Sequence, residues 1–125
     1  MPEYKFAKSH EWIAKFDDTY RMGISDFAQS QLGDITFVEF PNLGAKFAMG
    51  DSISSIESVK AVSEYYAPLD IEVVAVNNAL ENQPELVNID PMGKGYILEV
   101  VLLDESQLEH LMDSSTYEAL DKEGH

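Results

Sequence analysis

Residues 52–66 read SISSIESVKAVSEYY, and this stretch decides how the chain is expected to fold. Two strand-like runs, residues 52–59 and 61–66, lie on either side of one lysine. A hairpin formed by these two runs places Lys60 at its turn, where the side-chain ammonium points into solvent. The stretch therefore predicts an exposed β-hairpin with a lysine at its tip.

Further strand-like segments and turns alternate on both sides of this hairpin. Asp17-Asp18-Thr19 has the composition of a turn, and the runs that flank it predict a second hairpin. The other runs are rich in β-branched and aromatic residues, which favour a pleated surface. The additional strands are expected at residues 12–16, 20–24, 35–40, 71–76 and 96–102.

Helical patterns are short and lie mostly in the tail. Ser25 can act as the N-cap of a short helix, and Gly33 is placed to end it. A helical turn is expected near residues 85–87, and apolar residues return at helical spacing in residues 104–112. Another short helix can start at Ser114 or the residue after it. We therefore predict a mainly β (α+β) fold, a small sandwich or barrel with one early helix and helices at the C-terminus.

The composition fits one domain over residues 1–125, with 45% hydrophobic residues to form its core. The absence of cysteine excludes disulfides, thiolate metal sites and cysteine nucleophiles. A net charge of −15 argues against nucleic acid and membrane partners. This charge suits a monomer that meets its partners transiently, or it serves solubility alone. No run resembles a signal peptide or membrane span, so we expect a cytoplasmic location, or the mitochondrial matrix for a mature eukaryotic form.

Motifs for catalysis and metal binding are missing from the sequence. His10-Glu11 begins like a zinc-protease helix, but Ala14 stands where the second histidine is needed. His110 and His125 have no further ligand at suitable spacing, so we expect surface positions and no metal site. There is neither a glycine-rich phosphate loop nor a nucleophile elbow. Taken alone, Lys60 then reads as a solubilising lysine in a turn.

Glu57-Ser58-Val59-Lys60-Ala61 resembles the lipoylation motif of the glycine cleavage H-protein family. Four more blocks match the family in the same order along nearly the whole chain. They are residues 9–12 (SHEW), residues 23–24 with 28–29 and 32–35, residues 67–68 with 74–77, and residues 84–88 leading to Pro91. The acidic tail with Tyr117-Glu118 also resembles the family. Five ordered blocks are much more specific than one five-residue match.

This resemblance implies a lipoyl/biotinyl-carrier-like flattened β-barrel or sandwich, and a carrier protein that is not itself an enzyme. Lys60 is then the attachment point of lipoate, joined by an amide bond after a lipoylating enzyme has accepted the lysine's proton. The implied partners are a pyridoxal-phosphate-dependent glycine decarboxylase, a tetrahydrofolate-dependent aminomethyltransferase and an FAD-dependent dihydrolipoamide dehydrogenase. A flexible arm raises the effective concentration of its end at each partner's site.

The resemblance also implies roles for three polar residues. Ser9 and Glu11 match family positions that help to line a cleft for the loaded arm, and we expect Glu11 to face the aminomethyl ammonium. The alternative for Glu11 is a surface carboxylate beside a core tryptophan. Glu57 matches the acidic position three residues before the lysine that the family uses for recognition by lipoylating enzymes. The alternative for Glu57 is an ordinary solvated carboxylate.

Three positions depart from the family pattern. Ile71 stands where the family usually has a glycine, and we expect this position near the lysine turn. Met92 and Tyr96 replace a favoured tyrosine and tryptophan, and we expect them to repack a side patch. These departures leave open an H-like protein that stores or relays lipoyl groups. A biotin carrier usually reads Met-Lys-Met where this chain reads Val59-Lys60-Ala61, and an interaction module without lipoate is the last alternative.

Overall fold

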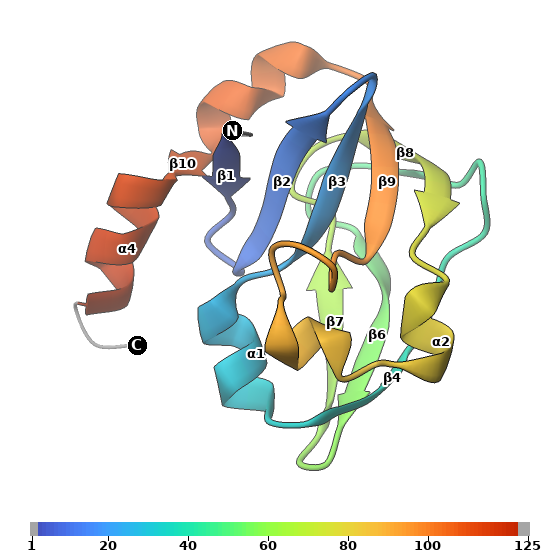
Figure 1. Ribbon diagram of the computed structural model, residues 1–125. Helices are drawn as coiled ribbons and strands as arrows, with labels where there is room; N and C mark the ends of the chain where they lie inside the picture. Colours follow the sequence, from blue (N-terminus) through green and yellow to red (C-terminus); the bar gives the residue numbers. More distant parts are fainter. Residues whose placement is uncertain (1–2, 123–125) are drawn as a thin grey trace.

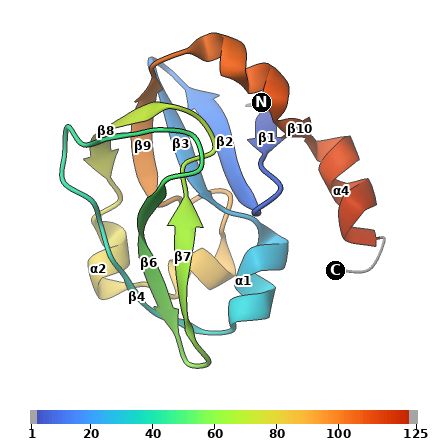
Figure 2. The ribbon, with the colours of Figure 1, turned by 180° about the vertical axis from the view of Figure 1, so that it is seen from behind.

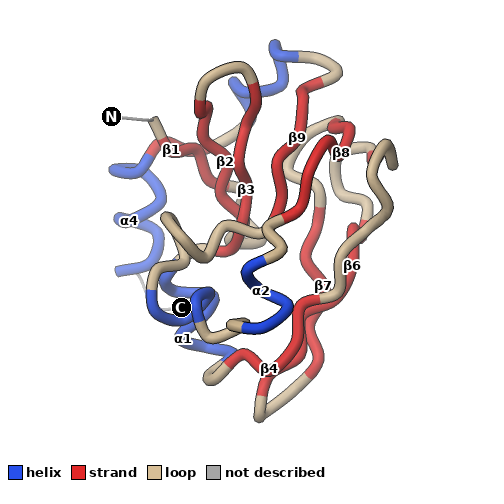
Figure 3. The backbone as a smooth tube through the Cα atoms, turned by 45° about the vertical axis from the view of Figure 1, so that its right-hand side comes forward, coloured by secondary structure: helices blue, strands red, loops and turns tan. Residues whose placement is uncertain are grey.

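Two antiparallel β-sheets that pack against each other form the body of the protein (Figures 1 and 2). The computed structural model describes residues 3–122. The helices lie around the edges of the sheets and at the C-terminal end (Figure 3). None of the described helices is long and apolar enough to cross a membrane.

The larger sheet has seven strands in the order β10-β1-β2-β3-β9-β8-β5, and the smaller sheet has three in the order β4-β6-β7. The strands of the larger sheet are β1 (Tyr4–Phe6), β2 (Glu11–Phe16), β3 (Thr19–Ile24), β5 (Lys46–Phe47), β8 (Ile71–Val76), β9 (Leu98–Leu102) and β10 (Met112–Asp113). Those of the smaller sheet are β4 (Ile35–Val38), β6 (Ser52–Ser58) and β7 (Val62–Tyr66). The helices are α1 (Asp26–Leu32), α2 (Ala79–Asn82), α3 (Leu86–Ile89), the 3₁₀-helix η1 (Glu105–His110) and α4 (Ser114–Lys122).

The main core fills the space between the two sheets. Ile13 and Met22 from the larger sheet share one buried cluster with Ile56 and Tyr65 from the smaller one. Alternate residues of a strand point to opposite faces, so Glu11 and Ile13 share the face toward the small sheet while Trp12 faces away. This alternation in β2 directs the side chain of Glu11 toward the small sheet, where the candidate site lies.

A second cluster covers the outer face of the larger sheet. It contains Trp12, Tyr117 and two further buried residues, and the indole N–H of Trp12 donates to the carbonyl oxygen of Pro91 at 3.0 Å. Met92 and Tyr96 pack against this cluster, so their expected place in a side patch is confirmed. The C-terminal helix α4 is therefore joined to the sandwich through an aromatic layer.

The predicted limits of α1 are confirmed. The hydroxyl of Ser25 accepts from the N–H of Ala28 at 3.1 Å, and Gly33, at φ +79°, ends the helix. The side chain of Asn88 then anchors this end. Its Nδ2 donates to the carbonyl oxygen of Gly33 and to Oε1 of Gln29, each at 2.8 Å. Hydrogen bonds from side chains thus hold α1 at both ends.

Several strand predictions are confirmed and others need correction. The strand at residues 71–76 and both predicted hairpins are present. The strand expected at 35–40 ends at Val38, and the one expected at 96–102 begins at Leu98. The amide side chain of Asn77 donates to the carbonyl oxygens of Lys94 and Tyr96, each at 2.8 Å, and so bends the chain just before β9. Three strands of two or three residues, β1, β5 and β10, were not predicted.

The expected position of Ile71 near the lysine turn is wrong. Ile71 opens β8 in the larger sheet, where it pairs with Phe47 and Leu102, and it is fully buried in the main core. Lys60 precedes β7, whereas Ile71 follows it, so the two residues lie beyond opposite ends of this strand. Ile71 does not have a positive φ either. A β-branched residue at this position is therefore a normal strand residue and does not distort the turn.

Candidate functional site

Lys60 lies in the turn that joins β6 to β7, as the sequence predicts. The hydroxyl of Ser58 accepts from the N–H groups of Lys60 and Ala61, both at 3.2 Å, and the N–H of Ser58 donates to the carbonyl oxygen of Ala61 at 2.8 Å. The N–H of Val59 donates to the carbonyl oxygen of Asp34 at 3.0 Å. The turn is thus closed on itself and tied to the segment before β4.

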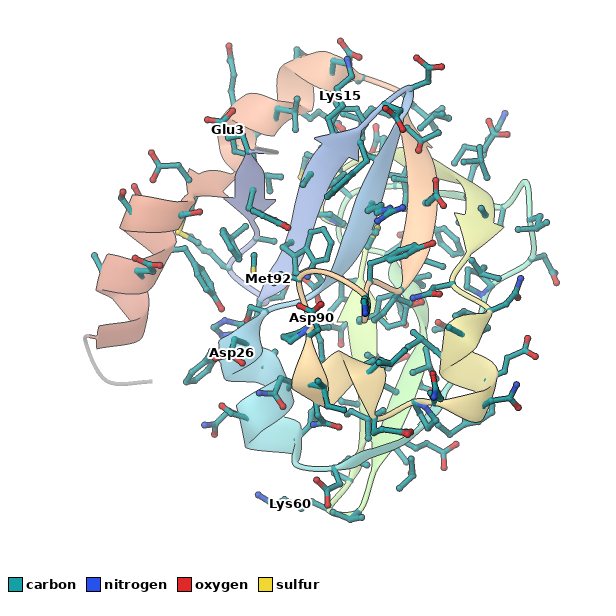
Figure 4. All side chains as sticks on the ribbon, viewed as in Figure 1. Glu3, Lys15, Asp26, Lys60, Asp90 and Met92 are labelled. Carbon is teal, nitrogen blue, oxygen red and sulfur yellow. The ribbon has the colours of Figure 1, made fainter. Side chains whose placement is uncertain are left out.

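The side chain of Lys60 is exposed at the end of the molecule (Figure 4). It forms no ion pair with any residue between 3 and 119. Its aliphatic stem runs over Gly33, because a Cβ atom placed on Gly33 would lie 3.2 Å from Cε of Lys60. A glycine at the end of α1 therefore makes room for the lysine, and the amine leaves the body beside the last turn of this helix.

A pocket of about 190 Å³ lies between α1 and the edge strand β7. Its residues come from the start of β2 and the two residues before it, from the end of β3, from α1 and from the β6–β7 hairpin. They are Ser9, His10, Glu11, Ile24, Phe27, Ala28, Gln31, Leu32, Ile56, Ser63, Glu64 and Tyr65. Leu32 directly precedes Gly33, and Ser63 is three residues from Lys60, so the pocket opens along the same elements that carry the lysine. We call this cavity the arm pocket.

Glu11 is the buried charged group of the arm pocket, with only 2% of its surface exposed. Its carboxylate accepts from the hydroxyl of Ser9 and, at 3.1 Å, from the backbone N–H of Tyr66 in β7. Burial raises the pKa of Glu11 to about 7, although the hydrogen bonds from Ser9 and Tyr66 act in the opposite direction. Near neutral pH this carboxyl group is thus poised to ionise when a positive charge arrives.

The predicted site residues divide into two groups. Ser9 and Glu11 meet in the arm pocket, and the burial of Glu11 excludes the alternative of a surface carboxylate. Glu57 lies outside the pocket, exposed on the outer face of the small sheet. We did not predict a place in the pocket for Glu64. The available signal was the position of Glu64, four residues after Lys60 on a predicted hairpin strand. The sequence did not show that α1 would lie opposite this strand.

The histidines do not form a metal site in the described part of the chain. No group of three or more His, Cys, Asp or Glu residues is arranged to hold an ion there. His110 is exposed at the end of η1, as expected, and His125 lies outside the described residues. His10 instead lines the arm pocket and contacts the hydroxyl of Tyr117.

The residues present fit a covalently attached lipoyl group. An arm needs an exposed amine on an ordered base, which the Lys60 turn supplies. The arm pocket has apolar walls from Ile24, Phe27 and Leu32 for a hydrocarbon chain and a buried carboxylate for a cationic end. The pocket and the amine also lie along the same helix and hairpin.

Comparisons with known proteins agree with this geometry. Residues 4–124 match the family described as Glycine cleavage H-protein. The chain is 50% identical over 119 residues to the glycine cleavage system H proteins of Escherichia coli O9:H4 (strain HS) and Salmonella newport (strain SL254), covering 94% of this chain and 92% of each relative. A crystal structure of a glycine cleavage system H protein from Mycobacterium marinum aligns with a TM-score of 0.83 and 30% identity. That alignment covers 95% of this chain and 96% of the other, and it confirms the predicted mainly β carrier fold. The chain therefore belongs to the glycine cleavage H-protein family.

Proposed function

We propose that Lys60 is the lysine that carries lipoate in this chain, and that the arm pocket receives the loaded end of the arm. As a member of the glycine cleavage H-protein family, the chain is a lipoyl-bearing carrier rather than an enzyme. The observation that carries the proposal is an exposed lysine on an ordered turn, beside a pocket built from the same hairpin. When bound, the lipoyl group supplies a long arm that ends in a redox-active dithiolane.

Attachment needs the amine of Lys60 as a nucleophile. The nitrogen Nζ attacks the carbonyl carbon of an activated lipoyl donor, the bond from that carbon to its leaving group breaks, and an amide bond forms. The ammonium must lose its protons to the modifying enzyme, because no described residue of this chain pairs with it to accept them. The chain contributes the fixed position of the turn, so that only the side chain has to be ordered.

Glu11 and Ser9 give the arm pocket its selectivity for a cationic load. An aminomethyl group carries an ammonium at neutral pH, and a buried carboxylate attracts such a charge much more strongly than an exposed one does. The hydroxyl of Ser9 and the N–H of Tyr66 hold the carboxylate in place. Phe27 and Leu32 supply apolar walls to the same space. We infer that this pocket protects a labile aminomethyl group from hydrolysis during transfer.

The proposed partners follow from this role. They are the pyridoxal-phosphate-dependent glycine decarboxylase, the tetrahydrofolate-dependent aminomethyltransferase, the FAD-dependent dihydrolipoamide dehydrogenase and a lipoylating enzyme. The bacterial origin of the relatives supports a cytoplasmic carrier. The strong negative charge supports a monomer that meets each partner briefly. The length and composition support one domain over residues 1–125.

Intact-mass measurement tests the attachment site. The chain is incubated with lipoate–protein ligase, ATP and lipoate, and we expect one lipoyl addition to the wild type and none to Lys60→Arg. Lys46→Arg and Lys94→Arg change exposed lysines elsewhere and should leave the addition intact. A lipoyl group on Lys60→Arg, or an unmodified wild type, would overturn the proposal.

Hydrolysis of the loaded carrier tests the pocket separately. Glu11→Gln retains the shape of the side chain but loses its charge, so the aminomethyl group should be lost faster than from the wild type. Glu57→Gln removes an exposed carboxylate outside the pocket and should not change the rate. An unchanged rate in Glu11→Gln contradicts the role of Glu11.

A further inference from the structure

We propose that Phe37, Glu57, Val59 and Val62, here called the tip patch, form the docking surface for the enzyme that acylates Lys60. This inference rests on the proposed function of Lys60. It adds a second recognition element to Glu57, namely an apolar surface on the neighbouring strands.

The sheet register brings three of these residues into one row. Phe37 of β4 pairs with Glu57 of β6, and Glu57 pairs in turn with Val62 of β7. Directly paired residues of an antiparallel sheet point to the same face. Phe37 and Val62 are 52% and 67% exposed, so a carboxylate lies between two solvent-exposed apolar side chains.

Val59 adds an exposed apolar side chain next to the lysine. It is 66% exposed and directly precedes Lys60 in the turn. Single exposed apolar residues are common on protein surfaces, but neighbouring ones mark interaction sites. Three large exposed apolar side chains around one modified lysine therefore point to a surface that another protein covers.

The tip patch is held in place before any partner arrives. The hydroxyl of Thr36 donates to the carbonyl oxygen of Glu57 at 3.2 Å, and the N–H of Val59 donates to the carbonyl oxygen of Asp34 at 3.0 Å. These bonds supplement the ladder between β4 and β6, whose register is irregular between Ile35 and Phe37. A surface that is already ordered loses little conformational entropy on binding.

The position of the tip patch favours the acylating enzyme over the other partners. That enzyme must bring its acyl carbon to Nζ, which is only a four-carbon stem away from the turn. Reacting atoms have to approach to about 3–3.5 Å, so the enzyme must cover the hairpin tip itself. The other three enzymes act at the far end of the finished arm and can reach it without covering this row.

The patch also defines the chemistry of the partner surface. Phe37 and Val62 require apolar side chains opposite them, and Glu57 requires a basic group between those side chains. The net charge of −15 supports a partner with a positively charged face around its active site. Apolar contacts then supply the affinity, while the charge of Glu57 fixes the position of the enzyme on the hairpin.

Steady-state lipoylation kinetics test this inference. We expect the double variant Phe37→Ser/Val62→Thr to raise the KM of lipoate–protein ligase for the unmodified carrier about tenfold or more, which corresponds to at least about 1.4 kcal/mol. The kcat should stay within about twofold, because the turn that holds Lys60 is unchanged. Glu57→Gln should also raise KM, and its effect should shrink as salt concentration increases.

The chain offers matched controls on other surfaces. Leu103 is 50% exposed and Leu43 is 65% exposed, close to the values of Phe37 and Val62, and neither belongs to the small sheet. Leu103→Ser/Leu43→Thr should therefore leave KM unchanged. Thermal unfolding of both double variants, monitored by circular dichroism, verifies that each is folded at the assay temperature.

Fully lipoylated variants distinguish the partners. Prolonged modification prepares lipoylated Phe37→Ser/Val62→Thr, which should support glycine decarboxylation at the wild-type rate. An equal loss with the decarboxylase would overturn the assignment to the acylating enzyme. An unchanged KM in the double variant, with the wild type modified at Lys60, would overturn the docking surface while the proposed function stands. A wild type that is never lipoylated would overturn both.

Discussion

Tyr117 in the C-terminal helix places its hydroxyl oxygen 2.5 Å from Nδ1 of His10, at the rim of the arm pocket. The same hydroxyl lies 2.7 Å from the hydroxyl of Ser25, the N-cap of α1. The ring of Tyr117 stacks on Phe6 with 4.3 Å between the ring centroids. His10 itself has a left-handed backbone, with φ +76°, and its carbonyl oxygen accepts from the N–H of Ser25 at 2.8 Å. One phenol thus joins α4 to the starts of both β2 and α1.

Tyr117→Phe should lower the free energy of unfolding by about 2 kcal/mol, because it removes one buried and one partly buried hydrogen bond, worth about 1 kcal/mol each. The stack on Phe6 is retained in this variant, so the loss reports on the hydroxyl. Urea denaturation measures the change. Tyr66→Phe removes a hydroxyl that has no hydrogen bond to any described residue, and it should have little effect. Equal stability of wild type and Tyr117→Phe would contradict the role of this contact.

Glu11 should make stability fall as the pH rises from about 4.5 to about 7. Burial raises its pKa from 4.5 to about 7 in the folded state, so in this window the folded protein binds more protons than the unfolded chain. Below about pH 4.5 the carboxyl group is neutral in both states and does not lower the free energy of unfolding. Above about pH 7 the full decrease in the free energy of unfolding is reached, on the order of 3 kcal/mol.

The matched test compares wild type with Glu11→Gln at pH 5 and pH 8 by urea denaturation. Glutamine keeps an oxygen for the N–H of Tyr66 but does not titrate. The variant should gain stability relative to wild type as the pH rises. A constant difference between wild type and Glu11→Gln would rule out a raised pKa.

Gly33→Ala should slow lipoylation of Lys60 as well as destabilise the fold. A Cβ atom at position 33 meets Cε of Lys60 at 3.2 Å, and a φ of +79° costs alanine about 1 kcal/mol or more. Gly44→Ala is the control, because Gly44 has φ +84° and no atom within 4 Å of the added Cβ. Both variants should lose stability in urea denaturation, but only Gly33→Ala should lower the rate of lipoyl addition measured by mass. Equal rates would show that the lysine stem does not depend on this glycine.

Tyr65→Phe should leave stability unchanged or raise it by up to about 1 kcal/mol. The hydroxyl of Tyr65 is buried without a hydrogen-bond partner in the described residues, and this burial raises the pKa of the phenol. The neighbouring hydroxyl of Ser54 donates instead to the carbonyl oxygen of Glu39 at 2.6 Å. Removing an unsatisfied buried hydroxyl removes its desolvation cost. A marked loss in thermal unfolding would reveal a partner for this group.

Local sequence patterns were sufficient to predict the elements whose formation depends on residues close together in the sequence. The run of β-branched residues in β8 and the capping pair Ser25 and Gly33 appear as predicted. β1 and β10 could not be predicted in the same way, because strands of two or three residues have no periodicity. They form since Lys5 and Phe6 pair with Asp113 and Met112, residues far away in the chain.

The part of the site that one segment forms could be predicted from the sequence. The part that forms where two distant segments meet could not. Lys60 and its exposure follow from the hairpin pattern alone. The burial of Glu11 depends on β7, whose Tyr66 N–H reaches the carboxylate across the gap between the two sheets. The place of Glu64 in the lining of the pocket likewise depends on α1 lying beside β7. The mistaken position of Ile71 came from the family resemblance, and only the structure shows that the length of β7 separates Ile71 from Lys60.

The lysine and one wall of the arm pocket belong to the same hairpin, and on the proposed function this arrangement limits how the arm can leave the pocket. Residues 63–65 are locked to β6 by a sheet ladder, so the distance from the turn to this wall is constant. The opposite wall, α1, is a seven-residue helix held by side-chain bonds at its two ends, from Ser25 and Asn88. On the proposed function, we expect a partner that withdraws the arm to shift α1 and to leave the hairpin unchanged.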